Sequence, residues 1–329
     1  MERITIGMRR TRHLLSLVLG TIILAAILSL FILAIANKIH VAQQPPRDAE
    51  GSIAVVMCPA CEQTFHNLLA GGGEIECALY DVGKGTAAVL ASVDARVITD
   101  DKTNAAYGEP IQGSALMHNK FCIINSTIIT SGSYNPTDGG AVNRNNLVIA
   151  HSPTLARNYA AQFDALSTGR REGAHEPLLY LGARENGSRI ENYFCPRDGC
   201  EDKVITALSK AQSSIYFMTF SFTSNSIGDA LLQARERGII VEGMCDERQS
   251  RSEKQYSECT RLEATLWDGN GLLHHKVFII DGETVVTGSY NPTASGTGKN
   301  NENILIVTDP LFAEAFYAEY LASKAQITK

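Results

Sequence analysis

Basic residues are scarce in this chain outside its N-terminal segment. Residues 1–38 hold five Lys and Arg and one acidic residue, which leaves 24 basic against 34 acidic residues, a balance of −10, for the rest of the 329 residues. A body with this balance repels polyanions unless a local basic groove intervenes. The surplus acid also has a simpler explanation in solubility, so it only lowers the expectation of a dedicated nucleic-acid binder.

Two familiar ligand-binding patterns are also missing. The glycine-containing stretch DVGKGTAAV around Lys84 lacks the spacing of a phosphate-binding P-loop, and it reads as a strand-to-helix turn. The eight cysteines lack the histidines that would complete a zinc site at the usual spacing. We therefore expect neither a nucleotide-binding P-loop nor a structural metal.

All eight cysteines follow residue 57, and their even number allows four disulfides in an oxidising compartment. Three pairs are close in sequence and are candidates for local bridges, Cys58–Cys61, Cys195–Cys200 and Cys245–Cys259. Cys77 and Cys122 lie in apolar, strand-like runs, and we expect them to be plain core residues.

The segment LLSLVLGTIILAAILSLFILAIA (14–36) contains no charge and follows a cluster of arginines. As a helix its 23 residues span about 35 Å, enough for a hydrocarbon core of about 30 Å. The flanking arginines predict a single-pass anchor with a cytoplasmic N-terminus and an extracytoplasmic body. The alternative is a cleaved signal with Ala34-Ile35-Ala36 as the cleavage site, although its apolar core would be unusually long. Both interpretations export the body.

One segment of twenty-one residues occurs twice with nearly the same sequence. MHNKFCIINSTIITSGSYNPT begins at Met117 and LHHKVFIIDGETVVTGSYNPT begins at Leu273, 156 positions later. Around each copy, strand-like and helical segments alternate, which predicts an α/β fold with a mixed sheet in each of two similar lobes, related by a pseudo-twofold axis. The predicted organisation is a basic cytoplasmic N-terminus (1–13), the anchor (14–36), a stalk (37–51), lobe 1 (52–168), a linker (169–186) and lobe 2 (187–329).

Both copies of this repeated segment carry reactive residues at identical intervals. Residues i and i+2 of a strand share a face, so each histidine points the same way as its lysine, and the returning strand brings Gly-Ser-x-Asn to the mouth of the same hairpin. The two sets are His118, Lys120, Asn125, Ser133 and Asn135, and His274, Lys276, Asp281, Ser289 and Asn291.

Such a cluster fits an oxygen-rich anion. Ammonium, amide and hydroxyl groups supply donors, and imidazole acts as nucleophile or as acid and base near neutral pH. Two clusters facing each other place histidines on opposite sides of one phosphorus atom, which is the geometry of in-line displacement. A structural role is acceptable for one His-x-Lys, but not for two with matching intervals.

These residues resemble the phospholipase D superfamily, whose signature is His-x-Lys-x4-Asp-x6-Gly-Ser-x-Asn, from about residue 52 to 325. The second half is most similar to Nuc-type endonucleases and the mitochondrial cardiolipin hydrolases. The resemblance implies a covalent phosphohistidine on one histidine, a second histidine as acid and base, phosphate held by the Lys and Asn pairs with Ser133 and Ser289, and no metal or other cofactor. Because those relatives carry one motif and pair as dimers, two motifs here imply a site complete within one chain.

Two departures from the signature matter. Asn125 replaces the usual Asp, at a position that is commonly supportive, so we expect activity to survive. Downstream, NNENILIV supplies Glu302 where NRNNLVIA supplies Asn145, and the resemblance implies that each reaches the histidine of the opposite motif. We therefore predict His118 as nucleophile, backed by Glu302, and His274 as acid and base, with Asn145 supporting. The catalytic set is His118, Lys120, Asn135, His274, Lys276, Asp281, Asn291 and Glu302.

Three functions remain open. The anchor and the acidic body favour phospholipid headgroups as substrate, with the membrane as partner. The resemblance to Nuc-type enzymes keeps cleavage of DNA or RNA as the alternative. A degenerate, inactive first half that serves only as a phosphate-binding scaffold is the third reading, motivated by Asn125. The sequence does not distinguish hydrolysis from transfer to an alcohol.

Overall fold

The computed structural model describes residues 45–170, 175–183, 187–251 and 257–327, together with Ile23, residues 26–29 and Phe31. The chain divides into two units, Met1–Pro45 and Pro46–Lys329. The predicted anchor at 14–36 lies largely outside the described residues. Within the part that is described, no helix has the length and apolar character needed to cross a bilayer. Every described strand and both copies of the repeated motif lie in the second unit.

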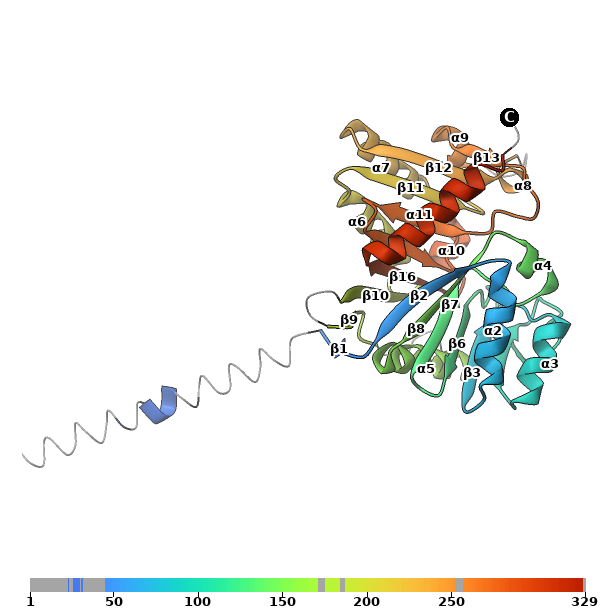
Figure 1. Ribbon diagram of the computed structural model, residues 1–329, viewed down its shortest axis with the longest axis vertical. Helices are drawn as coiled ribbons and strands as arrows, with labels where there is room; N and C mark the ends of the chain where they lie inside the picture. The colour runs from blue at the N-terminus through green and yellow to red at the C-terminus, as the bar shows by residue number, and fades with distance from the viewer. Residues whose placement is uncertain are drawn as a thin grey trace, which may run out of the picture. The chain divides into compact units, whose positions relative to one another are not determined.

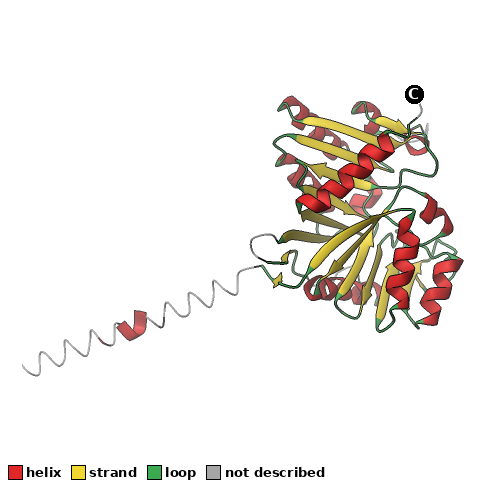
Figure 2. Ribbon diagram, in the orientation of Figure 1, coloured by secondary structure: helices red, strands yellow, loops and turns green. Residues whose placement is uncertain are grey.

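A seven-stranded sheet forms the first half of this unit (Figures 1 and 2). It is mixed, because β3 pairs in parallel with β4 and antiparallel with β6. The strands lie in the order β2 (Ser52–Met57), β8 (Asn146–His151), β7 (Ile128–Gly132), β6 (Lys120–Ile124), β3 (Ile75–Leu79), β4 (Arg96–Asp100) and β5 (Glu109–Ile111).

A nine-stranded sheet forms the second half and repeats the same succession of strands. β11 is parallel to β12 and antiparallel to β14, as β3 is to β4 and β6. Two extra strands extend it, from the predicted stalk and the predicted linker. The order is β1 (Arg47–Asp48), β9 (Leu178–Leu181), β10 (Ser188–Cys195), β16 (Glu302–Thr308), β15 (Thr284–Gly288), β14 (Lys276–Ile280), β11 (Ser214–Thr219), β12 (Ile240–Asp246) and β13 (Thr265–Trp267). The predicted α/β class with mixed sheets is confirmed.

Helices cover the sheets. One apolar core includes residues of both sheets and of α5 and α11, whereas separate cores lie under α2 and α3 and under α6 and α7. Helix α11 contacts β15 of its own sheet and β2 of the other, so it joins the halves. The helices are α2 (Ala60–Ala70), α3 (Lys84–Ser92), α4 (Asp138–Val142), α5 (Pro153–Ser167), α6 (Cys200–Ser209), α7 (Asn225–Glu236), α8 (Glu247–Ser250), α9 (Glu258–Arg261), α10 (Ala294–Gly298) and α11 (Pro310–Lys324).

The two long helices that end the halves begin at residues that local rules favour as helix starts. Ser152 and Asp309 are the N-cap residues, each directly before proline, and their side chains accept hydrogen bonds from the N–H groups of Leu155 and Phe312. Proline is favoured at the first helical position because its missing N–H would have had no helical partner.

All eight cysteines form disulfides, Cys58–Cys61, Cys77–Cys122, Cys195–Cys200 and Cys245–Cys259. The three local bridges are confirmed. The expectation that Cys77 and Cys122 are unpaired core residues is wrong, because β3 and β6 pair in the register that sets these two directly opposite each other. Only the pairing of strands 45 residues apart reveals this bridge.

Candidate active site

Each histidine of the repeated motif directly precedes a central strand. Lys120 opens β6 and Lys276 opens β14, with His118 and His274 two residues earlier. All four side chains are buried, with exposed fractions of 3% for the lysines and 7% for the histidines. Each lysine Nζ donates a hydrogen bond to the carbonyl oxygen of its own motif histidine at 2.7 Å. The histidines lie just before the strands and not within them, but each histidine and its lysine lie on the same side, because both contact one ring, Tyr80 in the first motif and Phe220 in the second.

The two halves meet through the backbone beside these histidines. The N–H of His118 donates to the Asn301 carbonyl, and the N–H of His274 donates to the Arg144 carbonyl, both at 2.9 Å. Each motif thus lies against the segment that begins the last strand of the opposite half. This places residue 302 at the first histidine and residue 145 at the second.

Glu302 holds His118. Its Oε2 lies 2.8 Å from His118 Nδ1, and the Ser289 hydroxyl donates to the same oxygen at 2.6 Å. Glu302 is fully buried. A carboxylate on Nδ1 accepts the Nδ1 proton and leaves Nε2 as the unprotonated nitrogen. The contact expected from the resemblance is present.

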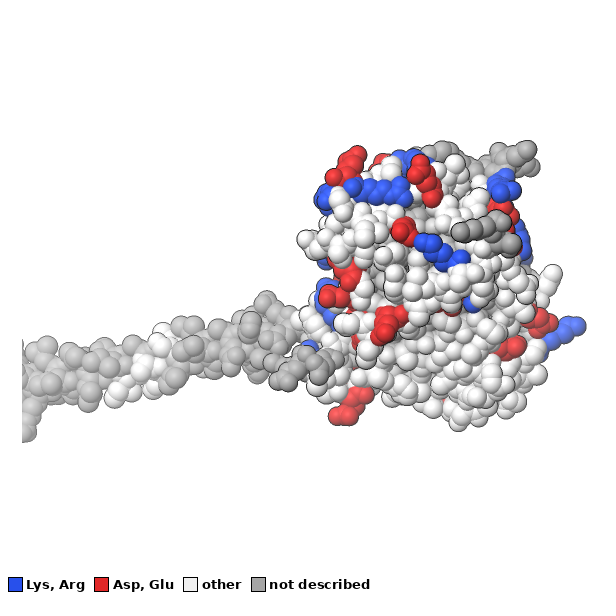
Figure 3. All heavy atoms as spheres, turned by 45° about the horizontal axis from the view of Figure 1, so that its top comes forward, with Lys and Arg blue, Asp and Glu red and all other residues white. Residues whose placement is uncertain are grey.

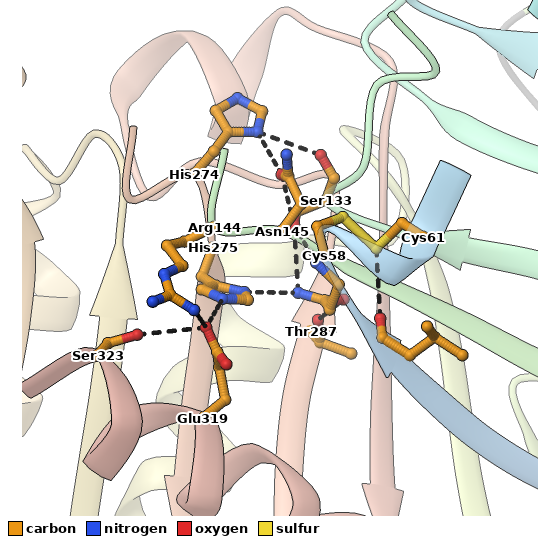
Figure 4. A network of polar contacts seen from close by, with 12 residues as sticks. Cys58, Cys61, Ser133, Arg144, Asn145, His274, His275, Thr287, Glu319 and Ser323 are labelled. Carbon is orange, nitrogen blue, oxygen red and sulfur yellow. Dashed lines mark hydrogen bonds and ion pairs between the residues drawn. A yellow bond between two sulfur atoms is a disulfide. The ribbon is translucent and has the colours of Figure 1, made fainter. Parts of the chain in front are cut away.

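Asn145 holds His274 in the corresponding way (Figure 4). Its Oδ1 lies 2.8 Å from His274 Nδ1, and the carbonyl oxygen of Ser133 lies 3.2 Å from the same nitrogen. Asn145 Nδ2 donates to the Gly140 carbonyl, which fixes the amide so that Oδ1 faces the histidine. The His274 Nδ1 therefore donates to a neutral acceptor, whereas the His118 Nδ1 faces a carboxylate.

Burial changes the acid–base properties of this cluster. Burial lowers the pKa of His118, and the Glu302 carboxylate opposes part of that effect. The pKa of His274 falls well below its usual value through burial and the nearby charges of Lys276 and Lys120. Burial lowers the pKa of Lys120 to about 7 and that of Lys276 well below its usual value, with the facing lysine contributing to the latter. Two buried lysines at one site repel each other, and an anion between them would reduce that repulsion.

An aromatic ring stands beside each histidine, outside the residues predicted for the site. Tyr80 lies edge-on to His118 with ring centroids 4.9 Å apart, and Phe220 lies edge-on to His274 at 4.8 Å. Both rings are half-buried, and the adjacent motif lysine lies over each of them. Tyr80 directly follows β3, which pairs with β6, and Phe220 directly follows β11, which pairs with β14. An aromatic residue at the end of each of these strands is the signal available in the sequence.

Two buried aspartates were also missed. Asp100 Oδ2 accepts from the backbone N–H of Met117 at 2.6 Å, and Asp246 Oδ2 accepts from that of Leu273 at 3.0 Å. Both hold the residue just before the motif histidine. Their signal is an aspartate ending the strand in VITD and again in EGMCD.

The motif serines have a role different from the predicted one. Ser133 Oγ donates to Asn145 Oδ1 and accepts from the Asn146 N–H, and Ser289 Oγ donates to Glu302 and accepts from the Asn303 N–H. Both serines are fully buried. Their hydroxyls are already committed to the residues that hold the histidines, so they position that pair instead of binding phosphate.

The glycine before each serine has a steric reason. Gly132 has φ +122°, and a Cβ there would lie 2.5 Å from the Asn146 carbonyl oxygen. A left-handed conformation and this close approach exclude larger residues. The predicted phosphate ligands Asn135 and Asn291 follow in the next loop, and the Oδ1 of each is buried without a protein partner among the described residues.

Asn125 and Asp281 lie at the opposite end of the hairpins. Both have positive φ and occupy the turns after β6 and β14. Asp281 accepts from the backbone N–H groups of residues 212–214, and Asn125 bridges residues 72 and 74. Burial acts to raise the pKa of Asp281, but those N–H donors outweigh it and lower the pKa. The placement of Asp281 in the catalytic set is therefore wrong, because a full strand separates it from His274, and Asn125 does the same local work without a charge.

Comparison with known proteins agrees with this geometry. The family model for "Cardiolipin synthase, PLD-like domain" matches residues 87–167 and 204–323. A phospholipase D of Rickettsia conorii is 32% identical over 143 residues, covering 42% of this chain and 70% of that protein. A mitochondrial cardiolipin hydrolase of Xenopus tropicalis is 29% identical over 151 residues, covering 44% and 68%.

A solved structure shares the fold over both halves. The phosphatidylserine synthase of Haemophilus influenzae has a TM-score of 0.63 with 12% identity, and the match covers 83% of this chain and 85% of that one. The family match spans both copies of the repeated motif and the strands that hold its histidines. The chain belongs to the phospholipase D-like (PLD-like) domain family and is a phosphodiesterase-type hydrolase.

Proposed function

We propose that this protein hydrolyses phospholipid headgroup diesters through a phosphohistidine intermediate, at one site shared by two lobes related by a pseudo-twofold axis. One observation carries the proposal. His118 and His274 are each held at Nδ1 by a residue of the opposite half, which leaves both Nε2 atoms for chemistry beside Lys120 and Lys276.

In the first step, Nε2 of His118 attacks phosphorus and the bond to the leaving alcohol breaks. His274 gives its Nε2 proton to the leaving oxygen, so the alcohol departs neutral. The two ammonium groups, with the amides of Asn135 and Asn291, hold the non-bridging oxygens as charge accumulates on them. These groups supply the positive charge that the reaction needs without a metal ion.

In the second step, water replaces the histidine. His274, now neutral, takes a proton from water while the oxygen attacks phosphorus and the bond to His118 breaks. Phosphatidate is released, and both histidines return to their starting states. These two steps need one histidine as the nucleophile and the other as the acid and base, so the two histidines are not equivalent.

His118 is the better nucleophile because of Glu302. Forming a bond at Nε2 leaves the ring positively charged, and a buried carboxylate 2.8 Å from Nδ1 stabilises that charge. The neutral amide of Asn145 gives His274 no such help. Substrate binding assists His274 instead, because a phosphate anion offsets the lysine charges that lower its pKa.

Phospholipid is favoured as substrate by charge and by the relatives. The body of the chain is acidic, and the face drawn in Figure 3 shows basic and acidic side chains interspersed among uncharged areas, with no continuous basic stripe among the described residues. The two relatives found by sequence and named above are a phospholipase D and a cardiolipin hydrolase. The apolar segment 14–36, as an anchor, would hold the body beside headgroups on the outer side of the membrane, with one chain supplying the whole site.

The test compares substrates in EDTA. The full chain is incubated with phosphatidylcholine or cardiolipin vesicles and, in parallel, with single-stranded DNA. Release of headgroup and phosphatidate without DNA cleavage supports the proposal, whereas DNA cleavage alone replaces it with an endonuclease. Loss of all turnover with retained binding of a phosphate analogue indicates a scaffold.

Labelled substrate distinguishes the histidines. In rapid-quench experiments the covalent phosphatidyl-enzyme is expected in His274→Ala and not in His118→Ala. The opposite pattern reverses the two roles.

A further inference from the structure

His275, the residue between His274 and Lys276, belongs to a second buried cluster that the catalytic steps do not use. It is fully buried, and its Nε2 lies 3.3 Å from Oε1 of Glu319 on α11. The same oxygen accepts from Arg144 at 3.4 Å and from the Ser323 hydroxyl at 3.2 Å. Figure 4 shows this cluster beside the Asn145–His274 pair.

Between the His274 cluster and the His275 cluster, each hydrogen bond has a defined donor and a defined acceptor. Asn145 Oδ1 faces Ser133 and His274, because its Nδ2 is committed to the Gly140 carbonyl. The Ser133 hydroxyl donates to that Oδ1, so its oxygen can only accept. It accepts from the backbone N–H of Asn146 at 3.0 Å and from the side-chain Nδ2 at 3.2 Å.

The side-chain amide of Asn146 links Ser133 to His275, and its orientation is also fixed. Its Oδ1 accepts from the Thr287 hydroxyl at 3.1 Å, so its Nδ2 faces Ser133 and His275. Nδ2 lies 3.0 Å from His275 Nδ1, which must therefore be unprotonated and accept. The remaining ring proton is on Nε2 and points to Glu319.

The first half has no such arrangement. Asn119 occupies the position equivalent to His275, and neither its Oδ1 nor its Nδ2 has a protein partner among the described residues. Asn303, the counterpart of Asn146, donates through Nδ2 to Ser131 and Tyr159 instead. The His275 cluster therefore serves the His274 side alone, which is the side where a neutral amide replaces a carboxylate.

We propose that His275 is a positioning residue for the acid–base histidine, acting as the acceptor that fixes Asn146, Ser133 and Asn145 in the orientation that holds His274. The inference rests on the proposed function. A neutral Asn145 orients His274 only if its oxygen, not its amide nitrogen, faces Nδ1. The Gly140 carbonyl favours that orientation, and the hydrogen bonds from His275 through Asn146 and Ser133 reinforce it. Glu319 and Arg144 in turn hold the His275 tautomer, as outer carboxylates do for other functional histidines.

Two substitutions separate positioning from packing. Asn at 275 can offer its Oδ1 where His275 has Nδ1, so His275→Asn keeps the acceptor for Asn146 and loses the contact to Glu319. His275→Gln reaches Glu319 and loses that acceptor. We expect kcat within about threefold of wild type for His275→Asn and about 10- to 100-fold lower for His275→Gln, with KM little changed in both.

The matched control is His66, a histidine outside both clusters whose Nε2 bonds Thr86. His66→Asn and His66→Gln should both keep wild-type kcat. Equal losses for the two substitutions at 275 overturn the inference, because they point to packing. A greater loss for His275→Asn also overturns it, because it shows that the hydrogen bond to Glu319 matters more than the acceptor for Asn146. If either variant fails to fold, Thr287→Val decides: it frees the Asn146 amide and should lower kcat, and an unchanged kcat overturns the inference.

Ring ¹⁵N NMR gives a readout that does not depend on turnover. We expect an unprotonated Nδ1 and a protonated Nε2 for His275 in the wild-type chain. A protonated Nδ1 refutes the inference even in an active enzyme. If the wild-type chain cleaves no phosphodiester, the proposed function fails, and the NMR result still decides the tautomer.

Discussion

Replacing Glu302 by Gln removes the one carboxylate that contacts the proposed nucleophile and keeps the side chain's size. Glu302 Oε2 lies 2.8 Å from His118 Nδ1 in a fully buried setting. In the proposed mechanism the ring becomes cationic only when Nε2 bonds to phosphorus, so the lost attraction belongs to the intermediate and to the transition state that leads to it.

The magnitude follows from the separation of the charges. With ring and carboxylate centres about 4 Å apart, their attraction is about 4 kcal/mol at an effective dielectric constant of about 20. Each 1.36 kcal/mol is a factor of ten in rate, so the full effect is about 10³-fold. Gln keeps an oxygen that can accept from Nδ1, and we expect kcat to fall about 10²- to 10³-fold with KM nearly unchanged.

The assay measures steady-state turnover on vesicles together with formation of the covalent intermediate by rapid quench. Formation of the intermediate should slow in Glu302→Gln. Glu314→Gln, an exposed carboxylate on α11, is the control and should match wild type. A kcat within threefold of wild type in a folded Glu302→Gln protein, or a rise in KM alone, refutes the role assigned to Glu302.

Further predictions concern the other half-site, the lysines and the disulfides. Asn145→Asp places a carboxylate at His274 Nδ1, raising the pKa of His274, so its protonated form persists to higher pH and the alkaline limb of kcat/KM should move upward; an unmoved limb contradicts the acid role. Lys120→Met should weaken binding of a phosphate analogue about 10- to 100-fold, measured by calorimetry, because a hydrogen bond to a charged group contributes about 1.5–3 kcal/mol. Replacing Cys77 and Cys122 by Ala should lower the free energy of unfolding by about 3–4 kcal/mol, and replacing Cys58 and Cys61 by clearly less, because the first pair closes a loop across 45 residues and the second across 3. Denaturant titration checks this, and equal losses contradict it.

Most of the predictions made from the sequence came from the repeated segment. Two copies of one motif, each inside alternating strand and helix patterns, predicted the α/β class, the mixed sheets and the residues that meet at the site. The helix starts at Ser152 and Asp309 are explained by local rules, because an N-cap and a following proline act within one turn.

Predictions failed where a side chain's partner lies far away in sequence. Asp281 matches the motif as well as His274 does, but its distance from the reaction depends on the length and direction of β14. Ser133 and Ser289 lie at the site as predicted, yet their hydroxyls bind Asn145 and Glu302, and no interval within the motif could show this. The Cys77–Cys122 bridge depends on strand register in the same way.

The sequence by itself therefore determined the chemistry available to this protein, because residue types and their spacing along a strand fix which groups share one face. The difference between Glu302 and Asn145 was also visible in the sequence through the family resemblance. Only the tertiary structure showed what lies behind Asn145, because Ser133, Asn146 and His275 come together only when the halves pack against each other. Side chains from opposite halves set the charge and the tautomer of each histidine, and such contacts exist only in the folded chain.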